Sequence, residues 1–331
     1  MTDACAAPAP RKERLSFDAA AGRTAEELNA RLKGTPAIIR RLTVHLSKAA
    51  GKNIRARSLL ACAMGRDGLI HSDAACLAAA VELLHLATLV HDDVIDGAAR
   101  RRGIAALHKK FGEKAAILCG DYLFCLSLEL ASAVEPPADR RVSADRTLSH
   151  YMSDILLGEL RQDQNNGNFA LTERQYFSII GGKTAAMFEA SFYAGFLLSD
   201  EPDEAGERFK EIGRNIGLIF QLADDCADYE ASHRTAGKPV LSDFKTGVVT
   251  LPLIYALKKD AGLLARIKAG LGPAALKKAV SSAGGLQYAR DRIAEYFEKT
   301  RDFIAALPSP PEKKDMLSAL LGKAAGRGAA P

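Results

Sequence analysis

The sequence has no tryptophan, and aromatic residues make up only 6% of its 331 residues. It also shows no stretch in which β-branched residues alternate with polar ones. Both absences argue against a β-sandwich, whose strands are rich in aromatic and β-branched side chains. Alanine and leucine are abundant instead, and these residues favour helices. We therefore expect an all-α protein organised as one large domain.

Features that would indicate several other classes of protein are also missing. The six cysteines form no C-x-x-C pair, and we expect them to be reduced thiols in the core. No signal peptide and no uninterrupted apolar run of ~18–20 residues is visible, which predicts a cytoplasmic protein without an integral membrane segment. The net charge is only +5. Because the basic residues do not form one long tract, nucleic acid is not an expected partner.

Composition divides the chain into an arm, a domain and a tail. Residues 1–23 are rich in alanine, proline and charge, which predicts a flexible N-terminal arm, and the Gly/Ala-rich residues 323–331 predict a flexible tail. Residues 24–322 form the predicted domain, whose first helix has Thr24 as its expected N-cap and Glu27 as the capping-box partner. Helical periodicity follows over residues 36–48, 58–64, 73–96, 114–134, 143–164, 172–198, 204–230, 250–259, 273–282 and 285–307.

Three carboxylates end the apolar run of residues 82–96: Asp92, Asp93 and Asp96. On a helix their spacing would allow all three to share one face. Carboxylates held together repel one another unless a cation lies among them. Oxygen ligands suit Mg²⁺, which usually keeps several waters and completes its shell with substrate phosphates. The arginines at 100–102 could hold phosphate oxygens that the metal leaves free.

The same pattern recurs about 130 residues later, where GLIFQLADDCAD at 217–228 contains Asp224, Asp225 and Asp228. Two D-D-x-x-D segments in similar apolar contexts are hard to explain as chance surface charge. They predict two carboxylate clusters that face each other across a cavity. A diphosphate bridged by several Mg²⁺ ions is the expected occupant of such a site.

With these motifs the sequence resembles the trans-polyprenyl diphosphate synthases, and the match extends from Gly51 to Pro252. The family-like segments are GKNIR at 51–55, HLATLVHDDVID at 85–96, RRG at 101–103, GDYLF at 120–124, GELRQ at 158–162, GGKT at 181–184, GLIFQLADDCAD at 217–228 and GKPVLSDFKTGVVTLP at 237–252. The resemblance implies a helical bundle of the isoprenoid synthase type around a central cavity. It also implies a homodimer and three Mg²⁺ ions per active site when substrate is bound, with Mn²⁺ able to substitute.

The resemblance also assigns expected roles to individual residues. The residues expected to bind the diphosphate of isopentenyl diphosphate are Lys52, Arg55, His85 and Arg102. The residues expected to bind the allylic diphosphate are Arg101, Lys183, Thr184, Gln221 and Lys238. The six aspartates and Lys183 are the expected catalytic residues, the aspartates as metal ligands. Gln162 is expected near the metal cluster, and Asp243 matches a family aspartate.

The chain departs from the family pattern in two places. Ala50 and Ala56 stand where the family usually has glycine and proline. More seriously, the family's D-x-x-x-G-K has become Asp243 to Val248, so the usual diphosphate-binding lysine is missing at position 248. Lys245, three residues earlier, is a partial substitute to consider.

Product length is predicted from the residues before the first aspartate motif. In the family, bulky residues four and five positions before its first aspartate close the product channel; here these are Thr88 and Ala87, with Leu84 one turn further back. A channel beside ~20 helical residues is ~30 Å long and holds about six extended isoprene units, so we predict a product of ~30 to 50 carbons, suited to quinone side chains. Its floor is expected at one of Leu123, Phe124, Leu126 and Leu128.

Other interpretations remain open. A short-chain farnesyl or geranylgeranyl diphosphate synthase would share every catalytic motif. A class I terpene cyclase usually replaces the second D-D-x-x-D and needs no isopentenyl site. A non-catalytic subunit of a two-subunit synthase commonly loses the aspartate motifs, which this chain keeps. A catalytic subunit that needs a partner would look the same as a self-sufficient enzyme.

Overall fold

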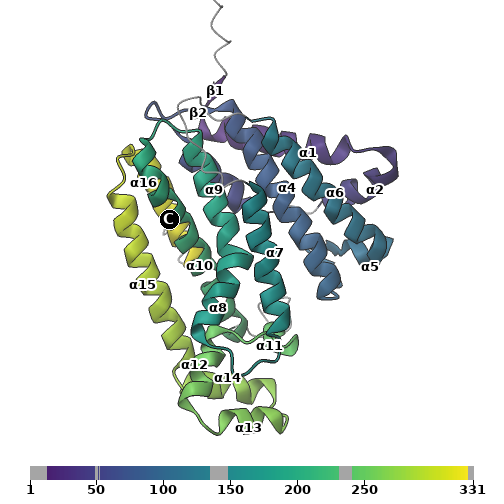
Figure 1. The fold of residues 1–331 in the computed structure, drawn as a ribbon, viewed down its shortest axis with the longest axis vertical. Coiled ribbons are helices and arrows are strands. Elements are labelled where there is room, and N and C mark those ends of the chain that lie inside the picture. The colour runs from purple at the N-terminus through teal and green to yellow at the C-terminus, as the bar shows by residue number, and fades with distance from the viewer. Residues whose placement is uncertain (1–12, 49–50, 52, 135–147, 231–240, 327–331) are drawn as a thin grey trace, which may run out of the picture. The chain divides into compact units, whose positions relative to one another are not determined.

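The computed structural model describes residues 13–48, 51, 53–134, 148–230 and 241–326. Nearly all regular structure in these ranges is helical (Figure 1), which confirms the predicted all-α class. The chain divides into two compact units, one made of Met1–Arg140 with Ala194–Glu201 and the other of Arg141–Tyr193 with Pro202–Pro331. The predicted central cavity involves residues of both units and stays a prediction.

The first unit is organised around one helix pair. Its elements are β1 (Arg14–Leu15), α1 (Phe17–Lys33), α2 (Ala37–Leu46), α3 (Ile54–Ala63), β2 (Ile70–His71), α4 (Ser72–Ile95), β3 (Arg100–Arg101), β4 (Ile104–Ala105), α5 (Leu107–Phe111) and α6 (Glu113–Ser132). Helices α4 and α6 lie side by side (Figure 1). Ala79 and Ala80 on α4 are fully buried, and the Ser127 hydroxyl on α6 donates to the Ala80 carbonyl at 2.9 Å. Small side chains thus let the two backbones approach closely.

Helices α4 and α6 are also the two described helices that are long and apolar enough to cross a membrane by length and composition. In α4 the most apolar 18-residue window is 67% buried within the protein, whereas in α6 the corresponding window is 39% buried. The burial of α4 is typical of a helix in the core of a folded domain.

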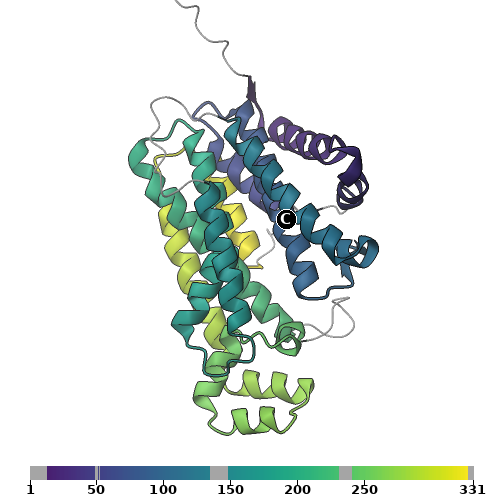
Figure 2. The ribbon, with the colours of Figure 1, turned by 45° about the vertical axis from the view of Figure 1, so that its right-hand side comes forward.

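The second unit is built around α10. Its elements are α7 (Leu148–Gln164), α8 (Glu173–Ile180), the π-helical turn η2 (Gly181–Ala185), α9 (Ala186–Leu197, whose last turn belongs to the first unit), η3 (Asp203–Ala205), α10 (Gly206–Glu230), α11 (Ser242–Lys245), α12 (Leu251–Lys259), α13 (Leu263–Lys268), α14 (Pro273–Ser282), α15 (Gly285–Ala305) and α16 (Pro311–Ala324). Helix α10 packs against η2, α15 and α16. The short helices α13 and α14 lie at one end of this unit (Figure 1, Figure 2).

Glycines allow α10 to pack closely against η2 and α9. A Cβ atom at Gly217 would lie 2.6 Å from the Ala185 Cα, and one at Gly213 would lie 2.8 Å from the Phe192 Cβ. Gly217 begins the second aspartate segment. Close packing at this point therefore fixes where that segment lies against η2.

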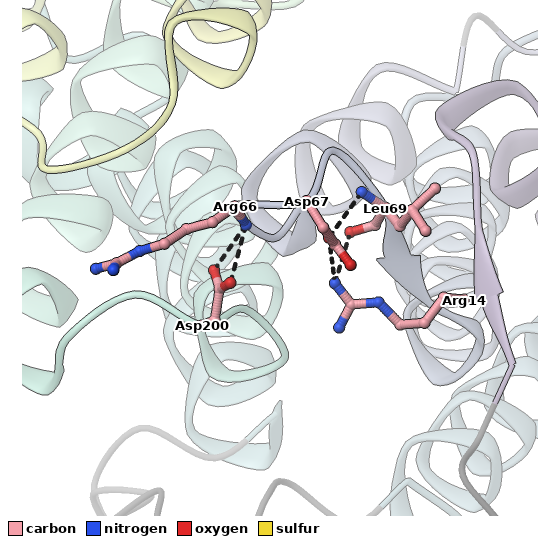
Figure 3. Close-up of polar contacts among 5 residues, drawn as sticks. All are labelled: Arg14, Arg66, Asp67, Leu69 and Asp200. Carbon is pink, nitrogen blue, oxygen red and sulfur yellow. Dashed lines mark hydrogen bonds and ion pairs between the residues drawn. The ribbon is translucent and has the colours of Figure 1, made fainter.

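The predicted N-terminal boundary was wrong. Helix α1 begins at Phe17 with Ser16 as its N-cap, and Thr24 lies inside the helix, where its hydroxyl donates to the Ala20 carbonyl at 2.8 Å. Part of the expected flexible arm is therefore structured, because β1 pairs with β2 and Arg14 binds Asp67 at 2.6 Å (Figure 3). Residues 1–12 lie outside the described ranges.

The loop before β2, which contains Arg66 and Asp67, also contacts the chain that follows α9. The backbone N–H of Arg66 donates to both carboxylate oxygens of Asp200, at 3.1 and 2.9 Å (Figure 3). Asp200 follows α9. The segment after α9 and the N-terminal segment with Arg14 therefore bind the same loop, at Arg66 and Asp67, within the first unit.

Other differences from the sequence predictions concern element boundaries. The expected helix over 172–198 is interrupted by η2, and the expected frayed tail from Lys323 begins inside α16. The two-residue ladders β1–β2 and β3–β4 were not predicted, since alternation cannot be recognised over two residues.

Candidate active site

The first aspartate motif lies at the C-terminal end of α4, and its three carboxylates differ in burial. Asp93 is buried; its Oδ1 accepts a hydrogen bond from Arg101 Nε at 2.7 Å and forms an ion pair with Arg101 Nη2 at 2.5 Å. Asp92 is half-buried, and Asp96 is exposed at the C-cap. The role of all three as metal ligands stays a prediction.

Helix α6 fixes the rotation of α4 at this motif. The His91 ring, which precedes Asp92, lies against Gly120 of the GDYLF segment, where a Cβ atom would be 2.4 Å from His91 Nε2. His91 Nε2 lies 3.2 Å from the Ile117 carbonyl oxygen and 3.2 Å from the Asp121 carboxylate. A side chain at position 120 would displace the ring. The glycine of this segment therefore has a packing role next to the site.

The RRG segment is a tight hairpin turn. Strands β3 and β4 pair on either side of Arg102 and Gly103, which have φ values of 47° and 82°. Two consecutive positive φ angles are typical of a type I′ turn, and glycine adopts them without strain. The turn directs Arg101 to Asp93, whereas Arg102 Nη2 lies 3.5 Å from His85 Nε2.

Arg55 and Arg102 flank His85 in the first unit. Arg55 Nη1 is 3.1 Å from His85 Nε2, so this nitrogen accepts from a guanidinium and the imidazole is neutral. Burial, followed by the charges of Arg55, Arg102 and Arg101, holds the pKa of His85 well below its usual value. Burial also lowers the pKa of Arg55 to about 10. Lys52, expected in this group, lies outside the described residues.

Glu82 is a member of this cluster that sequence analysis missed. It lies one turn before His85 on α4, is buried, and accepts from the Ala56 backbone N–H at 3.0 Å. Burial raises its pKa. A cavity of about 170 Å³ is lined by Glu82, His85, Arg102 and Gly51, among others. The sequence feature that could have indicated Glu82 is a charged residue within an apolar helical run.

In the second unit, Asp225 is buried and both of its oxygens are occupied. Tyr176 Oη donates to Oδ2 at 2.5 Å, and Gln221 Nε2 donates to Oδ1 at 2.7 Å. Burial, with a smaller contribution from the carboxylates of Asp243 and Asp224, raises the pKa of Asp225 to about 7. Sequence analysis did not identify Tyr176, which lies in α8, outside every family-like segment.

The predicted allylic-site residues Thr184 and Gln221 belong to the same network. The Thr184 hydroxyl donates to Gln221 Oε1 at 2.7 Å, and Gln221 in turn donates to Asp225. Three elements, η2, α10 and α8, therefore meet at one carboxylate. Gln162 does not join them; its amide donates to Asn166 at 3.2 Å.

Asp228 and Asp224 differ from Asp225. The Asp228 carboxylate accepts from the N–H and hydroxyl of Ser242, both at 3.0 Å, and from the N–H of Asp243 at 3.2 Å. It thus holds the turn that starts α11. Asp224 is exposed on α10. The three aspartates of this motif are therefore not equivalent either.

Lys183 lies in η2 and pairs with Glu159 of the GELRQ segment, Nζ to Oε1, at 2.8 Å. Near the altered end of the 237–252 segment, the Val248 N–H donates to the Asp243 carbonyl at 2.8 Å. Lys245 is exposed and forms no ion pair with another described residue. Lys238 lies outside the described residues.

With this geometry in view, the comparison with known proteins is decisive: a model of the polyprenyl synthetase family matches residues 36–281. The chain belongs to the polyprenyl synthetase family. A nonaprenyl diphosphate synthase of Mycobacterium tuberculosis is 31% identical over 82% of each chain. A geranylgeranyl diphosphate synthase of Methanosarcina mazei is 33% identical over 82% of this chain and 85% of its own.

Solved structures of the polyprenyl synthetase family have the same fold. The heptaprenyl diphosphate synthase of Staphylococcus aureus has a TM-score of 0.84 and 29% identity, covering 96% of this chain and all of its own. A polyprenyl synthase of Caulobacter crescentus, solved with calcium and isoprenyl diphosphate, has a TM-score of 0.81 and 31% identity over 97% and 100% of the two chains. The predicted isoprenoid synthase fold is confirmed.

The expected product-length residues of this polyprenyl synthetase lie in or beside the α4–α6 core. Ala87 and Leu84 are fully buried, and Ala87 belongs to the same apolar cluster as Leu123 and Leu126. Thr88 is half-buried, and its hydroxyl donates to the His85 carbonyl at 2.8 Å. A role in product length stays a prediction.

The carboxylates of both motifs suit a hard divalent cation by donor chemistry. Among the described residues, no three His, Cys, Asp or Glu side chains gather into a metal site. Asp96 in the first unit and Asp224 in the second are exposed carboxylates, and each would need further ligands such as phosphate oxygens to bind a cation. Burial is the main cause of the raised pKa of Asp225, and the carboxylates of Asp243 and Asp224 add to it.

Proposed function

We propose that this prenyltransferase is a Mg²⁺-dependent polyprenyl diphosphate synthase. It would condense isopentenyl diphosphate head-to-tail (1′–4) with an allylic prenyl diphosphate and yield an all-trans chain. The observation that carries the proposal is the neutral His85 between Arg55 and Arg102 beside a cavity. Two guanidiniums converging on an uncharged acceptor are suited to a diphosphate, whose oxygens accept from both.

The two diphosphates would bind different sets of residues. Arg55, His85 and Arg102, with Lys52, would bind isopentenyl diphosphate. The allylic diphosphate would contact Arg101 and, in the second unit, Lys183, Thr184 and Gln221, with Lys238. This division follows from the family resemblance and is supported by the cavity that His85 and Arg102 line and by the contact of Arg55 with His85.

All six aspartates would contribute ligands of Mg²⁺; Asp96 and Asp224 are the exposed ones, whereas Asp93, Asp225 and Asp228 also bind protein groups. When bound, the ions would stabilise the charge that develops on the departing diphosphate. The Caulobacter relative was solved with calcium and isoprenyl diphosphate, which supports a hard cation at a diphosphate site. We propose three Mg²⁺ per site, with Mn²⁺ as a substitute.

The protein's cations would assist ionisation of the allylic C–O bond. Lys183 and Arg101 neutralise charge as it develops on the diphosphate oxygens. The double bond of isopentenyl diphosphate, held by Arg55, His85 and Arg102, then attacks the allylic cation, and proximity supplies much of the rate. One C–C bond forms, one C–O bond breaks, and one proton leaves the new chain. The released diphosphate is the proposed acceptor of that proton.

We propose a medium- to long-chain product of about 30 to 50 carbons, since no bulky ring occupies positions 87 and 88. The nonaprenyl and heptaprenyl relatives support this choice. The alternative is a short-chain enzyme. Two observations support it: Ala87 is completely buried in a packed core, and one relative is a geranylgeranyl diphosphate synthase. Quinone side chains are the proposed use of the longer product.

We also propose a cytoplasmic homodimer with no nucleic-acid partner and no integral membrane segment. The exposed face of α6 supports self-association, because Ile117, Leu118 and Leu128 are 43%, 57% and 37% exposed there. Apolar residues gathered on one helix face are typical of interaction surfaces. Exposed Cys125 lies on the same helix, so oxidative cross-linking offers a direct test.

The deciding experiment is incorporation of labelled isopentenyl diphosphate by the purified protein with geranyl, farnesyl or geranylgeranyl diphosphate. Products are dephosphorylated and sized, with a chelator control. A Mg²⁺-dependent ladder ending at six or more units is the expected result. A stop at three or four units would select the short-chain alternative, and no incorporation would contradict a self-sufficient synthase.

A further inference from the structure

The GELRQ segment has a structural role that its resemblance does not explain. Gly158 of α7 lies directly against η2: a Cβ atom at this position would be 2.2 Å from the Lys183 backbone nitrogen. Gly182 of η2 is equally close to α7, since a Cβ atom there would lie 2.7 Å from the Asp154 carbonyl oxygen. Helix α7 and η2 therefore meet backbone to backbone, and neither position has room for a side chain.

The π-helical geometry of η2 affects the residue that follows Gly182. The Ala186 N–H donates to the carbonyl of Gly181, five residues back, so the turn contains one residue more than an α-helical turn. Such π-bulges are frequent at functional sites, because they shift side chains from the regular helical positions. Here the shift places Lys183 next to α7, where its ammonium binds Glu159.

The two neighbouring side chains of η2 are held by different helices. Lys183 binds Glu159 of α7 at 2.8 Å, and Thr184 binds Gln221 of α10 at 2.7 Å. The side chains of Lys183 and Glu159 are only 32% and 22% exposed, so solvent screens this pair less than an open surface pair. A lysine side chain is otherwise flexible, and a fixed partner limits the directions of its ammonium.

We infer that Glu159 is a positioning residue that aims Lys183 at the allylic diphosphate. The inference rests on the proposed function for the identity of the ligand. Glu159 itself need not touch substrate: its carboxylate keeps the ammonium in place, while the Gly158–Gly182 contact fixes the backbone that carries Lys183. The opposite possibility is that Glu159 competes with the diphosphate for Lys183, and the two make opposite predictions for substrate affinity.

A double-mutant cycle separates these ideas. Glu159→Gln should raise KM for the allylic substrate and lower its kcat/KM about tenfold, with KM for isopentenyl diphosphate unchanged. In a Lys183→Met background the same replacement should have no further effect, because the group on which Glu159 acts is gone. Glu159→Asp should restore part of the loss. Glu211→Gln, which removes the exposed Arg208–Glu211 pair, is the matched control and should match the wild type.

Equal losses in both backgrounds, or a lower allylic KM in Glu159→Gln, would overturn the inference. Failure of the proposed function is distinguishable, since the wild type itself would then form no product. In that case the four proteins of the cycle (the wild type, Glu159→Gln, Lys183→Met and the double variant) are titrated with inorganic pyrophosphate and Mg²⁺ by calorimetry. Glu159→Gln should bind pyrophosphate more weakly than the wild type. In the Lys183→Met background the same replacement should make no difference to binding, and additive losses would again contradict the positioning role.

Discussion

Asp93 Oδ1 accepts a hydrogen bond from Arg101 Nε at 2.7 Å and forms an ion pair with Arg101 Nη2 at 2.5 Å. Asp93 is buried and Arg101 is partly exposed, so the aspartate anchors the arginine and leaves part of its guanidinium for another anion. We therefore expect the middle aspartate of the first motif to act on the site through an arginine.

Replacing Asp93 and Asp96 should have different effects. Asp93→Asn should raise KM for the allylic substrate several-fold and lower the melting temperature, because it removes a buried charge partner. Asp96→Asn changes an exposed carboxylate and should leave the melting temperature unchanged while lowering kcat by about 10²-fold, as expected for lost transition-state stabilisation. Steady-state kinetics and thermal melts test both. Indistinguishable profiles would show that the two carboxylates play the same part.

The second motif predicts a similar contrast. Asp224→Ala should reduce turnover about 10²–10³-fold without loss of stability, because this residue is exposed. Asp228→Ala removes an acceptor of three hydrogen bonds and should cost about 2 kcal/mol of folding free energy. Urea unfolding and the incorporation assay give the two numbers. An unaltered unfolding midpoint in Asp228→Ala would contradict its assigned role in the turn.

Much of the site follows from the sequence, but the inequality of its aspartates does not. The spacing D-D-x-x-D locates the carboxylates on helices, as α4 and α10 show. It contains no information on Arg101 or Tyr176, whose contacts with Asp93 and Asp225 depend on separate elements. Tertiary partners decide which carboxylate is buried, and one sequence does not reveal them.

Helix boundaries and the packing contacts of glycines also depend on tertiary partners that one sequence does not reveal. Thr24 satisfies the capping-box pattern, yet Ser16 caps the helix because β1 pairing and the packing of α1 extend it backwards. Gly120 and Gly158 stand out in family-like segments, but their function is visible only as close contacts with His91 and with the Lys183 backbone.

We expect His85 to make the proposed isopentenyl diphosphate site sensitive to pH. Its folded-state pKa lies well below the ordinary 6.5, so below about pH 6.5 the unfolded chain binds more protons at this residue and the folded protein loses stability. The charged groups that contribute are Arg55 on α3 and Arg101 and Arg102 after α4, and Glu82 on α4 lines the same cavity as His85. Above about pH 6.5 the contribution of His85 to the pH dependence should disappear.

A bound diphosphate should offset the part of this shift that comes from the arginines. Its negative charge offsets the two guanidiniums, so the pKa of His85 rises and binding takes up a proton. Calorimetry of pyrophosphate binding in two buffers of different ionisation enthalpy measures the uptake, which should grow as pH falls from about 8 to about 6. His85→Gln keeps a polar side chain but cannot titrate, and should abolish most of it. Equal uptake in the variant would assign the proton to another group.

Restoring the missing lysine should strengthen the allylic site. Val248 is half-buried, and its N–H already binds the Asp243 carbonyl, so Val248→Lys leaves the loop hydrogen bond intact. One added cation near the diphosphate should lower KM for the allylic substrate about fivefold, with less effect on isopentenyl diphosphate. Val248→Gln is the neutral control. If Lys245 already supplies this charge, Lys245→Gln should raise the same KM and Val248→Lys should rescue it; no response to either change would show that this loop does not bind substrate.

Product length is best tested at Thr88 rather than Ala87. Ala87 has no exposed surface and packs in the α4–α6 core, so Ala87→Phe should cost about 1–3 kcal/mol through overpacking and confuse the readout. Thr88 is half-buried, and its hydroxyl binds only its own helix backbone at 2.8 Å. Thr88→Phe should therefore block the proposed channel and shorten the longest product, whereas the similarly sized Thr88→Val should not. Product sizing together with thermal melts tests this pair. A stable Thr88→Phe protein with unchanged products would place the channel elsewhere and leave the length of the product to residues outside α4.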